Sequence, residues 1–322
     1  MTRIVQAILP GLRQIFGTQG TVLLSSSSAS GLMEGSIRNC VAQRSLHLVA
    51  GAFGDRWRKL AEECGREPDA IEVPPGEAIA PEAVDEALRR GRFEAVCLTH
   101  NETATGVTNP LREIAAVVRR HEGVLLMVDA VSSLGGIPVE VDAHGIDVCF
   151  ASVQKALALP PGFSVCAVSE RALQKARIVK GRGYYFDFLH LAEASAKAQP
   201  LATPSVSHLV AMEAQLQVIQ REGLERRYAR HAQMGERVRG WAAERFGLFA
   251  RKGHESNTVT CVANTRKIDV AGFIEKLKGR GFQISNGYSE LKEKTFRIGH
   301  MGEHTLEGVE ALLQAMDEVL AA

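Results

Sequence analysis

LLMVDAVSSLGGIPVEVDAHGIDVCFASVQKALA, residues 125–158, is the stretch that decides the fold. An apolar run ends in Asp129, and a second run, Asp147–Ser152, leads into Gln154 and Lys155. Strands that are apolar throughout are typical of a parallel sheet covered on both faces. Because the carboxyl ends of parallel strands lie at one edge of a sheet, we expect these polar side chains to lie at that edge, where such sheets bind ligands.

Outward from this stretch, short β-rich runs alternate with longer amphipathic stretches from about residue 20 to residue 170. The predicted strands are 21–24, 46–50, 70–73, 95–99, 124–129, 148–152 and 164–168. The predicted helices between them are 31–41, 55–64, 81–89 and 110–121. Strands that alternate with helices of this length indicate crossover connections and an α/β fold with a mainly parallel central sheet.

The pattern changes after Ser169. Residues 171–178 and 206–245 are predicted to be helical. A strand–helix–strand–helix unit follows at 258–263, 270–278, 295–299 and 305–320. These segments predict a smaller C-terminal α+β domain. We place the boundary near residue 200, so that residues 1–200 form the large α/β domain and residues 201–322 the small one.

The composition argues against several classes of protein. The 322 residues include 38 Lys and Arg and 37 Asp and Glu, a net charge of +1 that does not favour nucleic acid as a partner. No apolar run approaches the roughly 18 residues that would cross a membrane, and the N-terminus is a poor signal peptide. The cysteines lack CxxC pairs and predict a cytoplasmic protein with reduced thiols: Cys40, Cys64, Cys97, Cys149, Cys166 and Cys261.

Asp129 and Lys155, at the ends of two strands, form an arrangement that pyridoxal phosphate can use. Lys155 would form a Schiff base with the cofactor aldehyde, and Asp129 would keep the ring nitrogen protonated. Val131 lies two residues after Asp129, so it would share the same face and pack against the ring if the extended geometry continues. The alternative is a simple salt bridge between Asp129 and Lys155.

Ser25–Asn39, SSSSASGLMEGSIRN, follows a short strand and opens a helix. Small and hydroxyl side chains leave the backbone N–H groups at a helix N-terminus accessible, which makes a phosphate site. The stretch is not a P-loop, because it contains no GxxxxGK[ST]. The alternative is a Ser-rich turn that only caps the helix.

The run VDAVSSLGG followed by GIDVCFASVQKALALPPG resembles the class V aminotransferases, pyridoxal-phosphate enzymes of fold type I, and within them the alanine–glyoxylate and serine–pyruvate aminotransferase group. The resemblance extends along nearly the whole chain. It is carried by GLRQIFGT at 11–18, AGAFGDRW at 50–57, LTHNETATGVTNPL at 98–111, RGYYFDF at 182–188, TPSVSHL at 203–209 and FRIGHMG at 296–302. It implies that the large domain holds the cofactor.

The resemblance also implies roles for individual residues. Lys155 matches the Schiff-base lysine, and Asp129 matches the acid on the pyridine nitrogen. The phosphate loop at the start of a helix is matched by Ser28, Ala29 and Ser30.

Further positions extend the implied site. Phe53 matches an aromatic stacked on the cofactor ring, Thr103 a hydroxyl that contacts the cofactor, and Gln154 the residue beside the lysine. Thr203 resembles a position that reaches the phosphate of the neighbouring subunit, which implies a homodimer. Arg297 matches the arginine that binds the substrate carboxylate, a task that suits its bidentate guanidinium.

The implied activity is transfer of an amino group from a small amino acid, such as alanine or serine, to a 2-oxo acid such as glyoxylate or pyruvate. Members of the family usually begin with a further segment before the helix containing GLRQIFGT, and this sequence starts almost at that helix. One alternative is therefore a non-catalytic or partner-binding subunit. A second is a cysteine desulfurase, although Gln154 stands where that branch has histidine and Cys261 lies in an apolar run.

Overall fold

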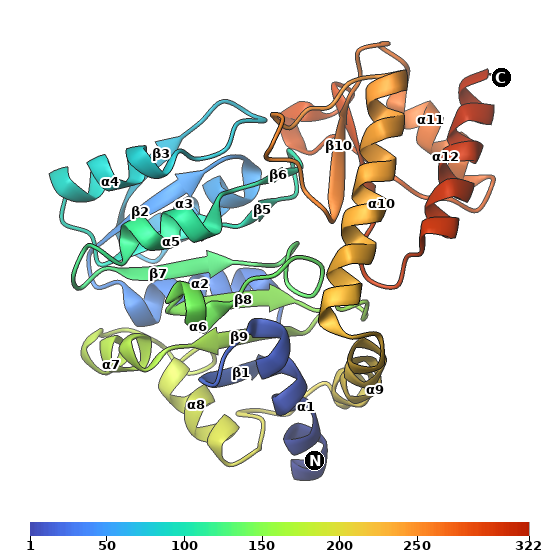
Figure 1. Cartoon of the computed structure of the whole chain (residues 1–322). Coiled ribbons are helices and arrows are strands. Elements are labelled where there is room, and N and C mark those ends of the chain that lie inside the picture. Colours follow the sequence, from blue (N-terminus) through green and yellow to red (C-terminus); the bar gives the residue numbers. More distant parts are fainter. Residues whose placement is uncertain (322) are drawn as a thin grey trace.

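The computed structural model describes residues 1–321, and a seven-stranded sheet forms its centre (Figure 1). The strand order is β1 (Thr21–Ser25), β9 (Ser164–Val168), β8 (Val148–Ser152), β7 (Leu125–Asp129), β4 (Ala95–Thr99), β2 (Arg44–Val49) and β3 (Glu67–Glu72). Neighbouring strands are parallel from β8 to β3, and β9 pairs antiparallel with both β8 and β1. The α/β fold with a mainly parallel sheet is confirmed.

Helices cover both faces of this sheet, which explains its apolar strands. One hydrophobic layer contains side chains of α2 (Ala29–Cys40), α3 (Ala52–Glu63), α7 (Glu170–Ile178) and α8 (Phe188–Ala196). The other contains side chains of α1 (Thr2–Phe16), α4 (Pro81–Arg90), α5 (Leu111–Val118), α6 (Val141–His144) and α9 (Val206–Glu222). Successive β7 residues alternate between the layers: Leu125 and Met127 pack into the first, and Leu126 and Val128 into the second.

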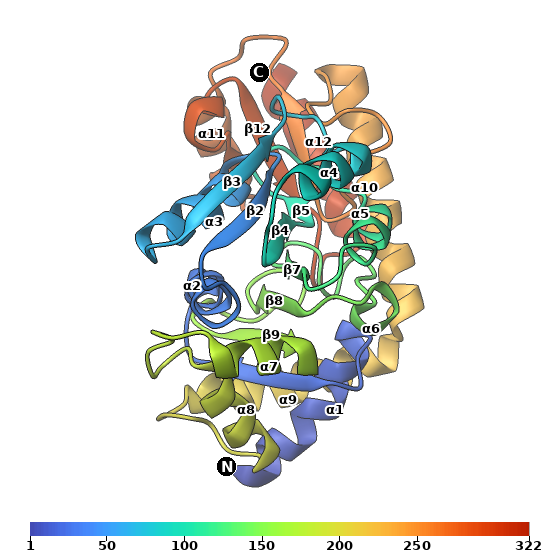
Figure 2. The ribbon, with the colours of Figure 1, turned by 90° about the vertical axis from the view of Figure 1, so that its left-hand side faces the viewer.

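A second unit follows along the chain, with its own sheet and core. Its strand order is β10 (Val259–Ala263), β12 (Thr295–Gly299) and β11 (Ser285–Asn286). The strands pack with α10 (Leu224–Arg245), α11 (Val270–Lys278) and α12 (Leu306–Ala321) in a third apolar cluster, and a short 3-10 turn, η1 (Ser289–Leu291), precedes β12. Figure 2 shows this unit beyond the β3 side of the central sheet.

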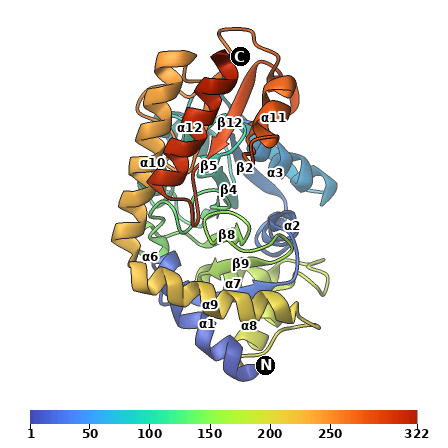
Figure 3. The same cartoon turned by 90° about the vertical axis from the view of Figure 1, so that its right-hand side faces the viewer.

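Helix α10 runs along one side of the molecule from α9 to α12 (Figure 3). A single helical segment over 206–245 was expected, but the structure divides it at Gly223, whose φ of 81° lies in the left-handed region that favours glycine. The side chains of α9 belong to the same apolar cluster as α1. The domain boundary near residue 200 stays a prediction.

Most strands match their expected ranges within two or three residues, and elements without a strong apolar pattern were not predicted. These include α6, α8, η1, β11 and the two-stranded pair β5 (Asn101–Glu102) and β6 (Val107–Thr108). All six cysteines are unpaired thiols. Among residues 1–321, no helix combines the length and apolar composition needed to cross a bilayer.

Candidate active site

A cavity of about 260 Å³ opens at the carboxyl ends of the central strands. Its walls come from the ends of β4, β7 and β8 and from the first turns of α2 and α3. It is lined by Ser28, Ala29, Ser30, Met33, Phe53, Arg56, Thr99, Asn101, Thr103, Asp129, Val131, Ser132, Gln154 and Lys155. All the predicted site residues except Thr203 and Arg297 are therefore in one place.

Asp129 is the last residue of β7 and is almost completely buried. The Val131 N–H donates to its Oδ1 at 2.8 Å, and no hydrogen bond to Oδ2 is found within residues 1–321. The pKa of Asp129 is raised to about 7, mainly by burial and also by Glu102, against the opposing effects of the Val131 N–H, Lys155 and Arg56. A cationic N–H at Oδ2 would favour the charged carboxylate.

Val131 lines the cavity from a turn rather than from a strand. The extended geometry does not continue past Asp129, because β7 ends there and a turn follows. Val131 still lines the cavity, but it does so from this turn, in which its own N–H bonds to the Asp129 carboxylate. The period of two along a strand therefore does not explain its position.

Lys155 lies in the turn that follows β8 and lines the cavity together with the more exposed Gln154. Burial lowers the pKa of the Lys155 amine, Arg297 lowers it further, and Asp129 opposes the shift. Within the described chain the Lys155 amine is in no ion pair, so the alternative of a structural salt bridge with Asp129 is not what the structure contains. An amine with a lowered pKa is a better nucleophile and base near neutral pH.

The Ser-rich stretch forms the N-terminus of α2. Ser28 is the N-cap residue, with extended backbone, and its side chain makes no capping hydrogen bond. The loop before it is fixed to the sheet, because the Ser164 hydroxyl donates to the Ser27 carbonyl at 2.8 Å. Ser28, Ala29 and Ser30 line the cavity, so the N-terminus of α2 lies at it, and the helix dipole favours an anion there.

Phe53 lies in the first turn of α3 and reaches both the cavity and the second unit. Its ring lies 5.3 Å from the ring of Tyr288, measured between centroids, and the Arg56 guanidinium lies 4.9 Å from its centroid. The Arg56 Nη2 donates to the Tyr288 hydroxyl at 2.6 Å. Across the cavity, Thr103 and Ser132 are joined by a hydroxyl–hydroxyl hydrogen bond of 2.5 Å.

Two predicted residues do not line the cavity. Arg297, on β12, donates to the Asn286 carbonyl at 3.1 Å and to the Thr103 carbonyl at 3.4 Å, so its guanidinium reaches the loop beside the cavity. Thr203 is exposed and lines a separate small hollow together with Ser26 and Tyr185. The roles suggested for both residues stay predictions.

Several polar groups of the site were not singled out from the sequence. Thr99 is buried and lines the cavity, and its hydroxyl has no hydrogen-bond partner in the described chain. Glu102 is fully buried and accepts from the N–H groups of Phe53 and Gly54, so it caps α3. Arg56 and Asn101 also line the cavity. All four lie inside the motifs AGAFGDRW and LTHNETATG, which would have been the signal to find them.

These groups fit pyridoxal phosphate. The cavity offers a carboxylate oxygen without a partner among the described residues for a ring N–H, an amine of lowered pKa for an aldehyde and a helix N-terminus for a phosphate. The Thr99 hydroxyl, buried without a partner, would gain one from a bound molecule, which removes the cost of leaving it unsatisfied. The donor set, rather than any one residue, matches the cofactor predicted from the sequence.

Comparisons with known proteins agree with this geometry. The family described as "Aminotransferase class-V" matches residues 51–312. A serine–glyoxylate aminotransferase of Methylorubrum extorquens is 34% identical over 90% of this chain and 76% of its own length. The small subunit of a soluble hydrogenase from a Synechococcus species is 32% identical over 99% of this chain and 85% of its own. The crystal structure of an alanine–glyoxylate aminotransferase from a Nostoc species superposes with a TM-score of 0.94, at 29% identity, over 99% of this chain and 87% of that one.

Proposed function

The chain belongs to the class V aminotransferase family, and from this premise we propose that it transfers the amino group of a small amino acid, such as serine or alanine, to glyoxylate or a similar 2-oxo acid. The observation that carries the proposal is the single cavity shared by Lys155, Asp129 and the N-terminus of α2. Such enzymes are pyridoxal-phosphate-dependent transaminases. The chemistry that the cofactor supplies when bound is a reactive aldehyde and a ring that accepts electrons from the Cα–H bond.

Three residues in and beside the cavity would have separate roles in the reaction. Lys155 would hold the aldehyde, and its amine would accept the proton from the Cα of the donor, a role favoured by the lowered pKa of that amine. Asp129 holds the proton on the ring nitrogen. Arg297 binds the carboxylate of the donor and of the acceptor, because a guanidinium pairs with a carboxylate through two parallel hydrogen bonds.

The phosphate end and the ring faces would be held by other groups. Ser28, Ala29 and Ser30 bind the phosphate through the N–H groups of the α2 N-terminus. Phe53 packs on one ring face and Val131 on the other. Thr103 and Gln154 hold the cofactor and the lysine from the sides of the cavity.

We also propose that the protein is a homodimer, in which Thr203 reaches the phosphate bound by the partner. Exposed aromatic side chains support the idea, because Tyr185, at 42% exposure, lines the same hollow as Thr203, and the adjacent Tyr184 is 61% exposed. Unpaired thiols throughout the described chain fit a cytoplasmic setting. Sedimentation equilibrium tests the dimer, and a mass of one chain at micromolar concentration would overturn it.

The absorption spectrum of lysine-bound pyridoxal phosphate tests the activity. Protein mixed with the cofactor is expected to show a visible band that alanine or serine bleaches and glyoxylate restores. Double-reciprocal plots for the two substrates are expected to be parallel, as in a ping-pong reaction. Lys155→Ala should abolish the band and reduce turnover at least about 10²- to 10⁴-fold, whereas Lys197→Ala, at an exposed surface ion pair, should retain both.

Two outcomes would favour other functions. A band that no amino acid bleaches would favour a non-catalytic subunit, a possibility raised by the hydrogenase-subunit relative. Release of sulfide from cysteine would favour a desulfurase, which the structure does not support. Burial on β10 raises the pKa of the Cys261 thiol to about 11, so this thiol is not prepared as a nucleophile.

A further inference from the structure

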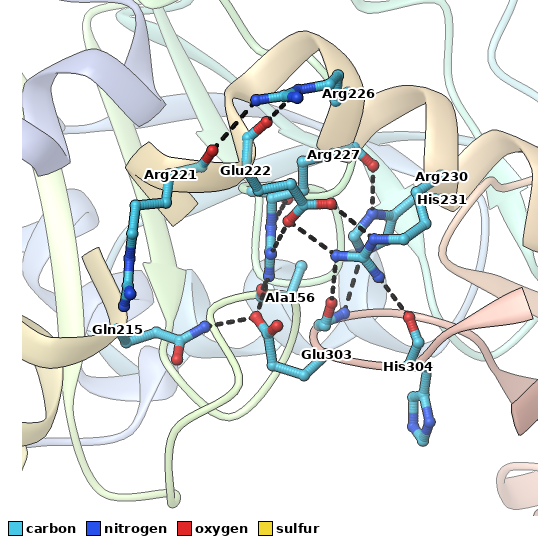
Figure 4. Close-up of polar contacts among 12 residues, drawn as sticks. Ala156, Gln215, Arg221, Glu222, Arg226, Arg227, Arg230, His231, Glu303 and His304 are labelled. Atoms are coloured by element: carbon cyan, nitrogen blue, oxygen red, sulfur yellow. Dashed lines mark hydrogen bonds and ion pairs between the residues drawn. The ribbon is translucent and has the colours of Figure 1, made fainter. Parts of the chain in front are cut away.

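Arg227 lies in the first turn of α10, outside the cavity, and its side chain is fully buried. Its Nε donates to the Gly135 carbonyl at 3.0 Å, and its Nη2 donates to the Ala156 carbonyl at 2.7 Å. Figure 4 shows this guanidinium at the centre of a polar cluster formed by the α9–α10 junction and two loops. One planar cation therefore spans two loops that are distant in the sequence.

These two loops carry the chemical groups of the site. Gly135 lies in the turn that follows Asp129, and Ala156 is the residue directly after Lys155. A guanidinium has rigidly arranged donors, so simultaneous bonds to both carbonyls fix the distance between the loops. Arg227 thus connects the segments that carry Asp129 and Lys155.

The buried charge of Arg227 is compensated by two carboxylates. Its Nη1 lies 2.7 Å from a Glu222 oxygen, and its Nη2 lies 3.0 Å from a Glu303 oxygen. Arg230, one turn further along α10, pairs with Glu222 at 2.6 Å and donates to the Gly302 carbonyl at 3.1 Å. A buried cation with this many partners holds one geometry, since any displacement leaves a charge unpaired.

The Lys155 turn is also packed closely from the other side. The Gly302 N–H donates to His231 Nε2 at 3.0 Å, and His231 donates from Nδ1 to the Arg227 carbonyl at 2.7 Å. A Cβ placed on Gly302 would lie 3.4 Å from the Lys155 carbonyl oxygen. The turn is therefore held between α10 and the loop after β12, with little room to move.

We propose that Arg227 is a positioning residue, which fixes the Lys155 turn against the Asp129 turn so that the amine and the carboxylate meet the same ring. The inference rests on the proposed function and extends it to a residue that touches neither cofactor nor substrate. The amine is the reacting group, and a shift of about 1 Å in such a group can cost about 10²-fold in rate. The bound substrate would still be held by Arg297, on a different strand.

Arg227→Lys is the first test. Lysine keeps the charge but lacks the rigid, spaced donors that fix the two carbonyls relative to each other, so kcat is expected to fall about 10- to 100-fold with little change in KM. Arg226→Lys is the matched control. Arg226 is the adjacent, exposed residue, and its guanidinium contacts only the Arg221 and Glu222 carbonyls, so wild-type kinetics are expected.

A second readout uses the protein without cofactor. The reaction of Lys155 with a small amine-reactive reagent, followed by mass spectrometry over a range of pH, reports the ionisation of its amine. A loosened turn admits water to the Lys155 amine, so the pH midpoint of its reaction is expected to rise in Arg227→Lys. The charged groups that face the amine, Asp129 and Arg297, are the same in both proteins. A role limited to stability would lower the melting temperature and leave this midpoint in place, which would overturn the proposal.

Glu303→Gln provides a variant that is expected to fold even if Arg227→Lys does not, because Glu303 is 46% exposed. It weakens one partner of Arg227 and should shift kcat and the Lys155 midpoint in the same direction by a smaller factor. Wild-type values for both quantities would contradict the inference. Absence of the visible band in the wild-type protein would instead overturn the proposed function. The pH midpoint of the Lys155 reaction, measured without cofactor, would still test the role of Arg227.

Discussion

The two sides of the cavity are built in different ways. The edge of the central sheet supplies Asp129, Lys155 and the α2 N-terminus from segments that each end or begin a regular element. On the other side, Tyr288 and Arg297 of the second unit do not line the cavity but contact two residues that do, Arg56 and Thr103. In the proposed function, the sheet edge would therefore carry the chemistry, and the second unit would contribute to substrate binding and alignment.

The largest effect is expected at the sheet edge, from Asp129→Asn. The amide has nearly the same shape but no negative charge, so it cannot hold a proton on the ring nitrogen. We expect kcat to fall about 10²- to 10³-fold, as when one preorganised electrostatic group is removed from an active site. Steady-state kinetics with alanine and glyoxylate measure this.

Asp147→Asn provides the matched control. Asp147 is also a buried aspartate, but it lies just before β8, at the edge of the sheet opposite the cavity. It accepts hydrogen bonds from the Ser169 hydroxyl and the Leu126 N–H. Its replacement should reduce stability and leave kcat nearly unchanged. Equal losses of kcat in the two variants would contradict the special role of the carboxyl edge.

The next largest effect is expected from the second unit, in Arg297→Lys. Lysine keeps the charge but loses the bidentate geometry, and a hydrogen bond to a charged group is worth about 1.5–3 kcal/mol. KM for the amino donor should therefore rise roughly 10- to 100-fold, with a smaller change in kcat. Arg239→Lys is the control, since Arg239 bonds to the Ser256 carbonyl outside the cavity. A fall in kcat at constant KM would place Arg297 with the chemistry instead.

The sequence was most informative about the sheet edge. The largely apolar runs 148–152 and 164–168 correspond to β8 and β9, because strands covered on both faces are nearly continuous in apolar residues. The residue that ends such a run is then placed by topology alone. That is why Asp129 and Lys155, which have no special local pattern, could be expected in one cavity.

The second unit was less predictable, because its contacts depend on tertiary packing. No periodicity indicates that Tyr288 bonds to Arg56 or that Arg227 bonds to Ala156. The pattern of residues 206–245 predicts one continuous helix. Only the left-handed conformation of Gly223 shows that the segment is divided into α9 and α10. An arginine in a helix is ordinarily read as exposed, so a fully buried Arg227 could not be anticipated from its neighbours.

A smaller effect is expected in the pH dependence of the free energy of unfolding, to which Asp129 makes its own contribution. In cofactor-free protein its folded pKa is about 7, above the ordinary value of 3.8, so the folded state binds more protons than the unfolded state between these values. This group therefore contributes stability below about pH 4 that is lost as pH rises through about 7. Asp129→Asn lacks this contribution.

Urea unfolding of both proteins between pH 4 and pH 8 tests the sign. The free energy of unfolding of the wild type minus that of Asp129→Asn should decrease as pH rises. Buried histidines such as His100 and His231, with pKa values lowered to about 4, act in the opposite direction but are common to both proteins and cancel. A difference that does not depend on pH would show that the Asp129 carboxyl is already ionised at pH 4.

The smallest effect is expected where the two sides meet, from Tyr288→Phe. The variant keeps the ring beside Phe53 and loses only the hydroxyl bonded to Arg56, a contact worth about 0.5–1.5 kcal/mol. KM should therefore rise about two- to tenfold at constant kcat, because the second unit is held less firmly over the cavity. If Tyr288→Phe lowered kcat more than Arg297→Lys raised KM, the second unit would take part in the chemical step, and the division between the two sides would fail.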